Sequence, residues 1–359
     1  MFDQIAWKLL EQLIETPSPS GREAGVQKLW KAYISSFVTN IETDVHGNAV
    51  AFRKGAADMR VAIIGHSDEI GLMVTYITDE GYIRFDGTAP AGVDVLKGQH
   101  VVIQTHKGAV FGVIGADDLK EDEKEGQRDK NSAGEKISDL WIDIGAQNKT
   151  ETRNVVTVGD PIVIEHKLKR LGTQHVVGQG LDGKIGIFVI AEVLRKLAGK
   201  TINPSIYACS TVQEEVTGAG AKIAAFKTNP HAAIVVDVTS ATDYPTSKKD
   251  KLGDIRMGSG PIISVGVAIN SVLSMLLKET AERIKTPFQI KAEPAYTETD
   301  ADDFFITREG IATGILSIPM RYIHTPVEHV HLQDVENTIL LLCEFLVNLR
   351  ENQDFRPVI

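Results

Sequence analysis

The chain has 359 residues, of which 43% are hydrophobic and 24% are charged. This is enough apolar content for a sizeable core, in two domains or in one large domain with an insertion. The formal net charge of −10 argues against a nucleic-acid partner and against attraction to an anionic membrane. No apolar run approaches the roughly 18 residues that a membrane-spanning helix requires.

The cysteine content indicates a reducing compartment. Cys209 and Cys343 are too few for a disulfide framework, and both lie in apolar segments where buried, unreactive thiols are expected. The first residues, MFDQIAWKLLEQLIETPSPSG, carry acids where a signal peptide carries bases, and they predict an amphipathic helix instead. We therefore expect a cytoplasmic protein.

Strand and helix signals alternate in both flanking parts of the chain. After the first helix, we expect strands at 61–66, 205–211, 232–239 and 313–319, and helices at 182–199, 218–227, 270–285 and 332–352. This alternation predicts an α/β sheet covered by helices on both faces, formed by residues 1–70 and 166–359.

The middle of the chain, residues 71–165, has a different pattern. Short β-like segments are separated by turn residues: LMVTYI, GYIRFDG, HVVIQTH, AVFGVIG, LWIDIG and PIVIEH. They predict a small β-barrel or sandwich inserted into the α/β domain. A run of mixed charge at 117–136 is expected to be a solvated loop.

Ionisable side chains cluster around the carboxyl ends of the predicted strands. Because ligands bind beyond these ends in open α/β sheets, we expect the side chains to meet at one edge. Two imidazoles and three carboxylates suit a pair of Zn²⁺ or similar ions, with one carboxylate bridging them. The seven ionisable residues at these ends, from which the ligands would come, are His66, Asp68, Asp182, Glu214, Glu215, Asp237 and His324.

The stretch STVQEEV places Glu214 and Glu215 side by side where a strand ends. Neighbouring residues of an extended segment point in opposite directions, so the backbone must turn here for both to reach one site. One glutamate can then bind metal while the other takes a proton from a water molecule. We expect no metal-binding or catalytic role for the remaining histidines, which are His46, His100, His106, His166, His175, His231, His329 and His331.

The sequence resembles the two-metal aminopeptidases typified by glutamyl aminopeptidase, deblocking aminopeptidase and tetrahedral aminopeptidase, some relatives of which carry an endoglucanase label. The resemblance covers nearly the whole chain. It includes PSPSG, DVHGNAV, GHSDEIGLMV, ISDLWIDIGAQNKTE, VVGQGLDGKIG, TVQEEV, VDVTSATDYP, TDADDFF and SIPMRYIHTPVEHVHLQDVENT.

The resemblance implies a role for each site residue. His66 and Asp237 would bind one metal ion, Glu215 and His324 the other, and Asp182 would bridge them. Glu214 would be the general base, and Asp68 would orient the imidazole of His66. The ions would be Zn²⁺ or Co²⁺, with Mn²⁺ as a further choice.

The resemblance also implies the architecture and the assembly. It implies a zinc-peptidase-like catalytic domain, with a mixed sheet between helices, and a PDZ-like barrel that mediates dimerisation. The dimers would assemble into a homododecamer. The expected function is therefore hydrolysis of the N-terminal residue of peptides.

Three departures from the family pattern and several alternatives accompany this expectation. Gly183 stands where Asp is usual, Thr217 stands where Gly is usual, and EPAYTETDA lacks the Gly- and Thr-rich approach to Asp300. A related two-metal dipeptidase or N-acyl deacylase, a glycosidase, and a non-catalytic metal-binding assembly protein are the alternatives. The preferred N-terminal residue is not predicted.

Overall fold

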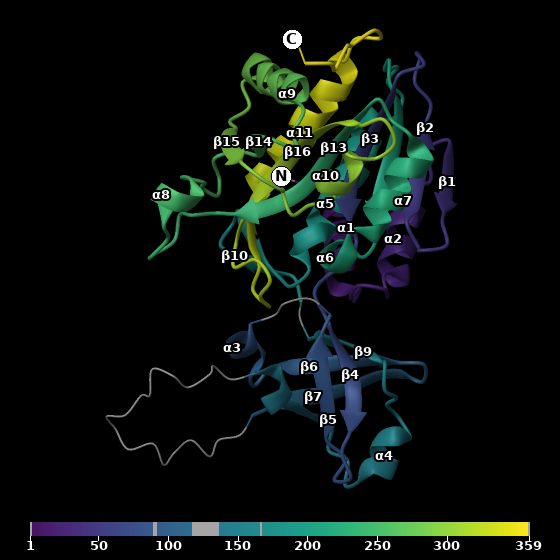
Figure 1. The fold of residues 1–359 in the computed structure, drawn as a ribbon, viewed down its shortest axis with the longest axis vertical. Coiled ribbons are helices and arrows are strands. Elements are labelled where there is room, and N and C mark those ends of the chain that lie inside the picture. The colour runs from purple at the N-terminus through teal and green to yellow at the C-terminus, as the bar shows by residue number, and fades with distance from the viewer. Residues whose placement is uncertain (1, 89–91, 117–135, 166, 358–359) are drawn as a thin grey trace. The chain divides into compact units, whose positions relative to one another are not determined.

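The computed structural model describes residues 2–88, 92–116, 136–165 and 167–357, and the chain divides into two compact units (Figure 1). The first unit comprises Met1–Glu69 and Lys167–Ile359, and the second comprises Ile70–His166. Except for Lys136, the charged run at 117–136 lies outside the described residues. None of the described helices is long and apolar enough to cross a membrane.

The first unit contains a mixed sheet in which eleven described strands take part, with the path β1-β2-β12-β3-β13-β16-β17-β11-β10 and with β14 pairing β15 and β16. Its central strands β12, β3, β13 and β16 are parallel. The strands are β1 (Asn40–Thr43), β2 (Ala49–Arg53), β3 (Arg60–His66), β10 (Lys169–Leu171), β11 (His175–Val177), β12 (Ser205–Thr211), β13 (Ala232–Ser240), β14 (Ile262–Gly266), β15 (Gln289–Glu293), β16 (Ala312–Arg321) and β17 (His329–His331).

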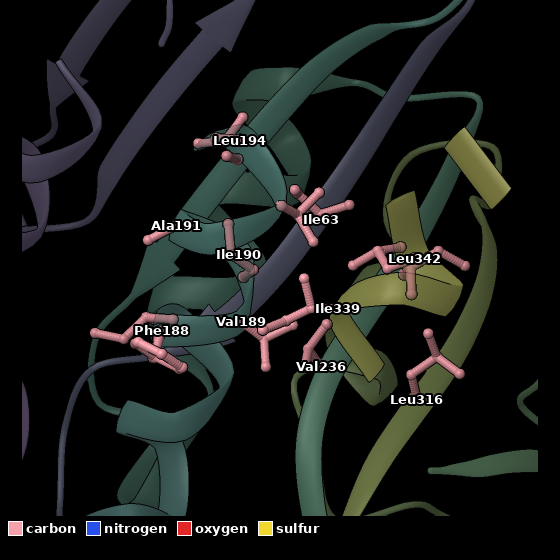
Figure 2. Packing of buried hydrophobic residues seen from close by; sticks show 14 of the residues in the cluster. Ile63, Phe188, Val189, Ile190, Ala191, Leu194, Val236, Leu316, Ile339 and Leu342 are labelled. Atoms are coloured by element: carbon pink, nitrogen blue, oxygen red, sulfur yellow. The ribbon is translucent and has the colours of Figure 1, made fainter. Parts of the chain in front are cut away.

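Helices cover both faces of this sheet. Alternation along β3 places Ile63 in the core on one face and Ile64 in the core on the other. Figure 2 shows the first face, where Ile190 of α5 and Ile339 of α11 lie close to Ile63. The helices are α1 (Gln4–Glu15), α2 (Ala24–Ile34), α5 (Leu181–Leu197), α6 (Glu214–Thr217), α7 (Ala219–Thr228), α8 (Lys249–Leu252), α9 (Ser271–Ile284), α10 (Ala301–Phe304) and α11 (Leu332–Asn348).

Helix α5 packs unusually close to the sheet. A Cβ atom added at Gly186 would lie 2.4 Å from the carbonyl oxygen of Val236, and one added at Gly65 would lie 3.0 Å from the backbone of Gly186. The first turn of α5 is also irregular, because Gly183 has a φ of +78°. The close contact brings the start of α5 to the carboxyl ends of β3 and β13.

The second unit is a closed barrel in the order β4-β5-β8-β7-β6-β9, and its ladders are antiparallel. Buried and more exposed side chains alternate along much of β4 and β6, whereas all four residues of β9 are buried. The elements are β4 (Leu72–Ile77), β5 (Ile83–Gly87), α3 (Val93–Leu96), β6 (His100–Thr105), β7 (Gly108–Gly115), the 3₁₀ turn Ile137–Asp139, β8 (Trp141–Asp143), α4 (Lys149–Arg153) and β9 (Pro161–Ile164).

The predicted fold class, an α/β sheet with helices and an inserted small β-barrel, is confirmed. Cys209 and Cys343 are free and buried, as expected. The last helix ends at Asn348, earlier than the predicted residue 352.

Candidate metal centre

The carboxyl edge of the parallel strands brings the predicted site residues together. His66 is the last residue of β3, and Asp182 lies in the irregular first turn of α5. Glu214 and Glu215 open the short helix α6 directly after β12, and Gln213 before them has a φ of +59°. The backbone therefore turns at the glutamates, as the sequence predicts.

The remaining two predicted ligands come from β13 and from the loop after β16. Asp237 lies inside β13 rather than beyond it, because this strand extends to Ser240. His324 follows β16 and has a φ of +60°. His66 is only 2% exposed, whereas the side chain of His324 is 47% exposed.

One group of ligand atoms forms around His66. Its Nε2 lies 3.3 Å from Oδ1 of Asp182 and 3.6 Å from Oδ1 of Asp237. These three residues could hold a metal ion together.

A second group forms around His324. Its Nε2 lies 3.4 Å from Oδ2 of Asp182 and 3.5 Å from Oε2 of Glu215. This trio could also hold an ion. Asp182 thus turns one carboxylate oxygen toward each imidazole, which is the arrangement that a bridging ligand needs.

The spacing and the chemistry of these atoms fit divalent metal ions. Tetrahedral Zn²⁺ with bonds of about 2.0–2.1 Å separates its ligand atoms by about 3.3 Å, close to the contacts seen here. Imidazole and carboxylate ligands suit Zn²⁺ and similar ions. A bound dication would also counter the negative charge of carboxylates that are buried together.

The electrostatics show how strongly these groups depend on counter-charge. Burial raises the pKa of Glu214 and of Glu215 well above the ordinary range. Burial alone would lower the pKa of His66, but the charge of Glu214 and the contacts with Asp182 and Asp237 raise it well above its usual value. Without a cation, protonation of these two glutamates and of His66 would reduce the negative charge of the group.

Glu214 lies beside the first group without joining its closest contacts. Its Oε2 is 4.0 Å from Nε2 of His66, and its side chain is 13% exposed. Because His66, Glu214 and Glu215 also form a possible ligand group, distance alone does not decide which glutamate would bind metal. The carboxylate of Glu215 lies closer to an imidazole than that of Glu214 does, because its Oε2 is 3.5 Å from Nε2 of His324.

Asp68 supports both His66 and the glutamate turn. Its Oδ1 lies 3.4 Å from Nδ1 of His66 and accepts a hydrogen bond of 3.1 Å from the backbone N–H of Glu214. Its Oδ2 accepts from the N–H of Glu215 and from the hydroxyl of Ser20. Burial opposes the charge of Asp68, but contact with His66 keeps its pKa below the ordinary value.

Gly183 is suited to its place beside the first ligand. An added Cβ atom would lie 2.3 Å from atoms of the His66 ring, and the φ of +78° already disfavours a side chain. The departure from the family pattern at this position therefore matches the local packing.

Buried acids beyond the predicted set also support the site. Asp300 is 1% exposed, and its Oδ2 lies 2.5 Å from the hydroxyl of Thr211, which also contacts the carbonyl of Gly65. A hydroxyl has one proton, so both contacts are satisfied when Asp300 is protonated. Burial raises the pKa of Asp300 to about 7, although a hydrogen bond donated by Thr211 would lower it. No predicted strand precedes Asp300, so the strand-end argument missed it, although the motif TDADDFF contains it.

A second buried group lies beneath Asp182. Glu328 accepts a 3.0 Å hydrogen bond from the backbone N–H of Asp182. Lys184 is fully buried and donates to Glu69 at 2.9 Å and to the carbonyl of Thr16. These contacts anchor the turn that carries Asp182, and their large sequence separations hide them from sequence analysis.

Three of the other histidines lie together and belong to neither ligand group. Nε2 of His329 lies 3.0 Å from Nδ1 of His175, and the rings of His175 and His331 are 4.6 Å apart. We call these three residues the histidine cluster. Burial lowers the pKa of all three, that of His329 to about 4.

A cavity of about 680 Å³ adjoins the predicted metal ligands. Its lining is mostly polar, and the side chain of Lys222 on its wall is paired with Asp303 at 3.3 Å. The further lining residues are Thr217, Gly218, Val238, Thr239, Ser240, Lys291, Thr297, Glu298, Thr299, Asp302 and Ile323.

Comparison with known proteins identifies relatives along the whole chain. The family described as M42 glutamyl aminopeptidase matches residues 47–341. The lysyl aminopeptidase of Pyrococcus furiosus is 32% identical, over 98% of this chain and 100% of that protein.

Solved structures agree with this comparison. Aminopeptidase APDkam598 from Desulfurococcus kamchatkensis superposes with a TM-score of 0.90 at 31% identity, covering 99% of this chain and 98% of that one. The TET1 peptidase of Pyrococcus horikoshii, which can assemble into a tetrahedron or a large octahedral shell, superposes with a TM-score of 0.82 at 28% identity. That match covers 96% of this chain and 100% of the other.

Proposed function

The chain belongs to the M42 glutamyl aminopeptidase family of metallo-aminopeptidases, and on this premise we propose that it removes the N-terminal residue of peptides at a two-metal centre. The observation that carries the proposal is the position of Asp182, whose two oxygens face the imidazoles of His66 and His324. His66 and Asp237 would hold one ion, Glu215 and His324 the other, and Asp182 both.

Two divalent ions in this centre would lower the pKa of a water molecule and polarise the scissile carbonyl group. Glu214 would take the proton of the attacking water and later deliver it to the leaving amine. Burial favours this role, because it raises the pKa of Glu214 and so makes the carboxylate a stronger base. Asp68 would hold His66 and the backbone of Glu214 in place.

The test is a panel of aminoacyl-anilides assayed with protein reconstituted in Zn²⁺, Co²⁺ or Mn²⁺. We expect hydrolysis of substrates with a free α-amino group, and none by the metal-free protein. N-acetylated amino acids, dipeptides and cellulose oligomers serve as competing substrates. Faster hydrolysis of any of these would favour the deacylase, dipeptidase or glycosidase alternative, and a fully loaded protein inactive on all of them would favour a metal-binding assembly protein.

We also propose that the barrel mediates dimerisation, with assembly into a homododecamer. The outer surface of the barrel supports this, because Phe111 is 63% exposed and Tyr76 is 52% exposed. The tetrahedron formed by the P. horikoshii relative is a second argument. Sedimentation analysis tests it: the expected species has twelve times the chain mass of 39.1 kDa, and Phe111→Glu should reduce it to smaller species.

A further inference from the structure

The turn that carries Glu214 and Glu215 has its backbone held by two buried carboxylates. The N–H of Gln213 donates to Oε1 of Glu23 at 3.2 Å. The next two N–H groups donate to Oδ1 and Oδ2 of Asp68, at 3.1 and 3.2 Å. Three consecutive donors are thus taken by side chains from two other segments, and Asp68 accounts for only two of them.

Gln213 is the residue of this turn that most needs support. Its φ of +59° and ψ of 32° lie in the left-handed region, which is unfavourable for a residue with a side chain. The direction in which the chain leaves Gln213 determines where the side chain of Glu214 points. A partner for the N–H of Gln213 therefore has direct consequences for the proposed general base.

The side chain of Glu23 does not stabilise the start of its own helix, α2. It occupies the N-cap position of α2, yet its side chain makes no capping hydrogen bond there. Its Oε1 instead accepts from the N–H of Gly21 at 2.7 Å and from the N–H of Gln213. Glu23 is only 4% exposed, so a carboxyl group has been removed from water to make these contacts.

We propose that Glu23 is a positioning residue for the general base: it holds Gln213 in the left-handed conformation that directs Glu214 toward the metal centre. This inference rests on the proposed function. Glu23 touches no reacting atom, so it acts only through the backbone of Gln213. The segment PSPSG, which precedes Glu23, thereby gains a role, because Ser20 also donates to Asp68.

Three variants of Glu23 separate its possible contributions. Glu23→Ala removes the acceptor. Glu23→Asp keeps a buried carboxylate, but one methylene too short to reach the N–H of Gln213. Glu23→Gln keeps an oxygen at the same position. Tyr33→Phe is the matched control, because it removes a hydrogen bond between the same helix and a buried carboxylate, Glu192, away from the turn.

The measurements are kcat, KM, bound metal and Tm, with the full-length protein reconstituted in Co²⁺ or Zn²⁺. We expect Glu23→Ala and Glu23→Asp to lower kcat by about 10- to 100-fold, the range found for residues that orient catalytic groups, with KM and metal content unchanged. Glu23→Gln should stay within about threefold of the wild type, because the acceptor remains. Tyr33→Phe should lower Tm while kcat stays unchanged.

If Glu23→Ala does not fold, Glu23→Asp and Glu23→Gln decide the question alone. A wild-type kcat in Glu23→Asp would overturn the inference. So would a kcat in Glu23→Gln that is lowered as much as in Glu23→Asp. An effect on KM or on metal content instead of kcat would also overturn it. A wild-type protein inactive on every aminoacyl substrate would overturn the proposed function itself, which is a different result.

Discussion

Two groups of histidines on the same sheet differ in what surrounds the imidazoles. In the candidate metal centre, Nε2 of His66 has three carboxylates within 4.0 Å. In the histidine cluster, His175, His329 and His331 contact one another instead. Among the described residues, every group able to hold a metal ion lies in the first region.

The surroundings shift the histidine pKa values in opposite directions. In the metal centre, carboxylates overcome the effect of burial and raise the pKa of His66. In the histidine cluster, burial and the charges of His175 and Arg321 lower the pKa of His329 to about 4. Neutral imidazoles need no cation, whereas carboxylates that are buried together must either be protonated or be balanced by positive charge. Nearby acids, rather than the number of histidines, therefore distinguish the candidate metal centre from the histidine cluster.

The largest expected effect is on catalysis by Glu214→Gln. Removing a general base lowers kcat by about 10²–10⁴-fold, since base catalysis contributes that much. Metal content should stay at two ions per chain, because the five proposed ligands remain. Metal analysis and kcat on one preparation check this. A near-normal rate would contradict the assignment of the base, and loss of one ion would show that Glu214 is a ligand.

The next largest effect is expected from a histidine substitution in the candidate metal centre, compared with the same substitution in the histidine cluster. His324→Gln should cost one of two ions and reduce activity by about 100-fold, since it removes a ligand of the second group. His331→Gln makes the same chemical change in the histidine cluster and should keep both ions. Metal content by mass spectrometry of the native protein distinguishes the two. Equal losses from both variants would invalidate the comparison.

Metal removal should lower stability by a smaller amount. An ion at a hundred times its Kd stabilises the native state by about 2.7 kcal/mol, so chelation should lower Tm by several degrees. The negative charge of the candidate metal centre must then be balanced by protonation, which the raised pKa values of Glu214, Glu215 and His66 favour. Thermal unfolding before and after chelation, and after restoring Zn²⁺, measures the difference. An unchanged Tm after verified metal loss would show that the centre does not depend on cations.

The smallest effect concerns the pH dependence of stability through His329. Its folded pKa of about 4 lies below the ordinary value of about 6.5, so the fold favours the neutral ring. The resulting contribution of His329 to the free energy of unfolding is fully present above about pH 6.5 and is lost as the pH falls toward 4. His329→Gln should therefore lose less stability than the wild type between pH 7 and pH 5. Urea midpoints at both values test this, and equal changes would contradict it.

The sequence predicted the sheet and its edge because both follow from local patterns. Apolar runs ended by ionisable residues predicted β3 and β12, and parallel pairing then placed Thr211 opposite His66. The barrel strands followed from short β-like segments separated by turn residues.

The supporting acids could not be found in this way. Glu23, Asp300 and Glu328 lie in loops or at helix ends, where a carboxylate is usually solvated. Their burial results from contacts between segments far apart in sequence: Glu23 and Gln213 are separated by 190 positions. No periodic pattern encodes such a contact.

The close contact between Gly65 and Gly186 has a consequence for recognising inactive copies of this enzyme. A methyl group at position 186 would need to push α5 away from the carbonyl of Val236. The displacement would carry Asp182 with it, although Gly186 is not itself a proposed ligand. A gene duplicate that retains all seven predicted site residues but has a larger residue at position 186 should therefore be a pseudoenzyme. This position is worth inspecting before activity is assigned from ligands alone.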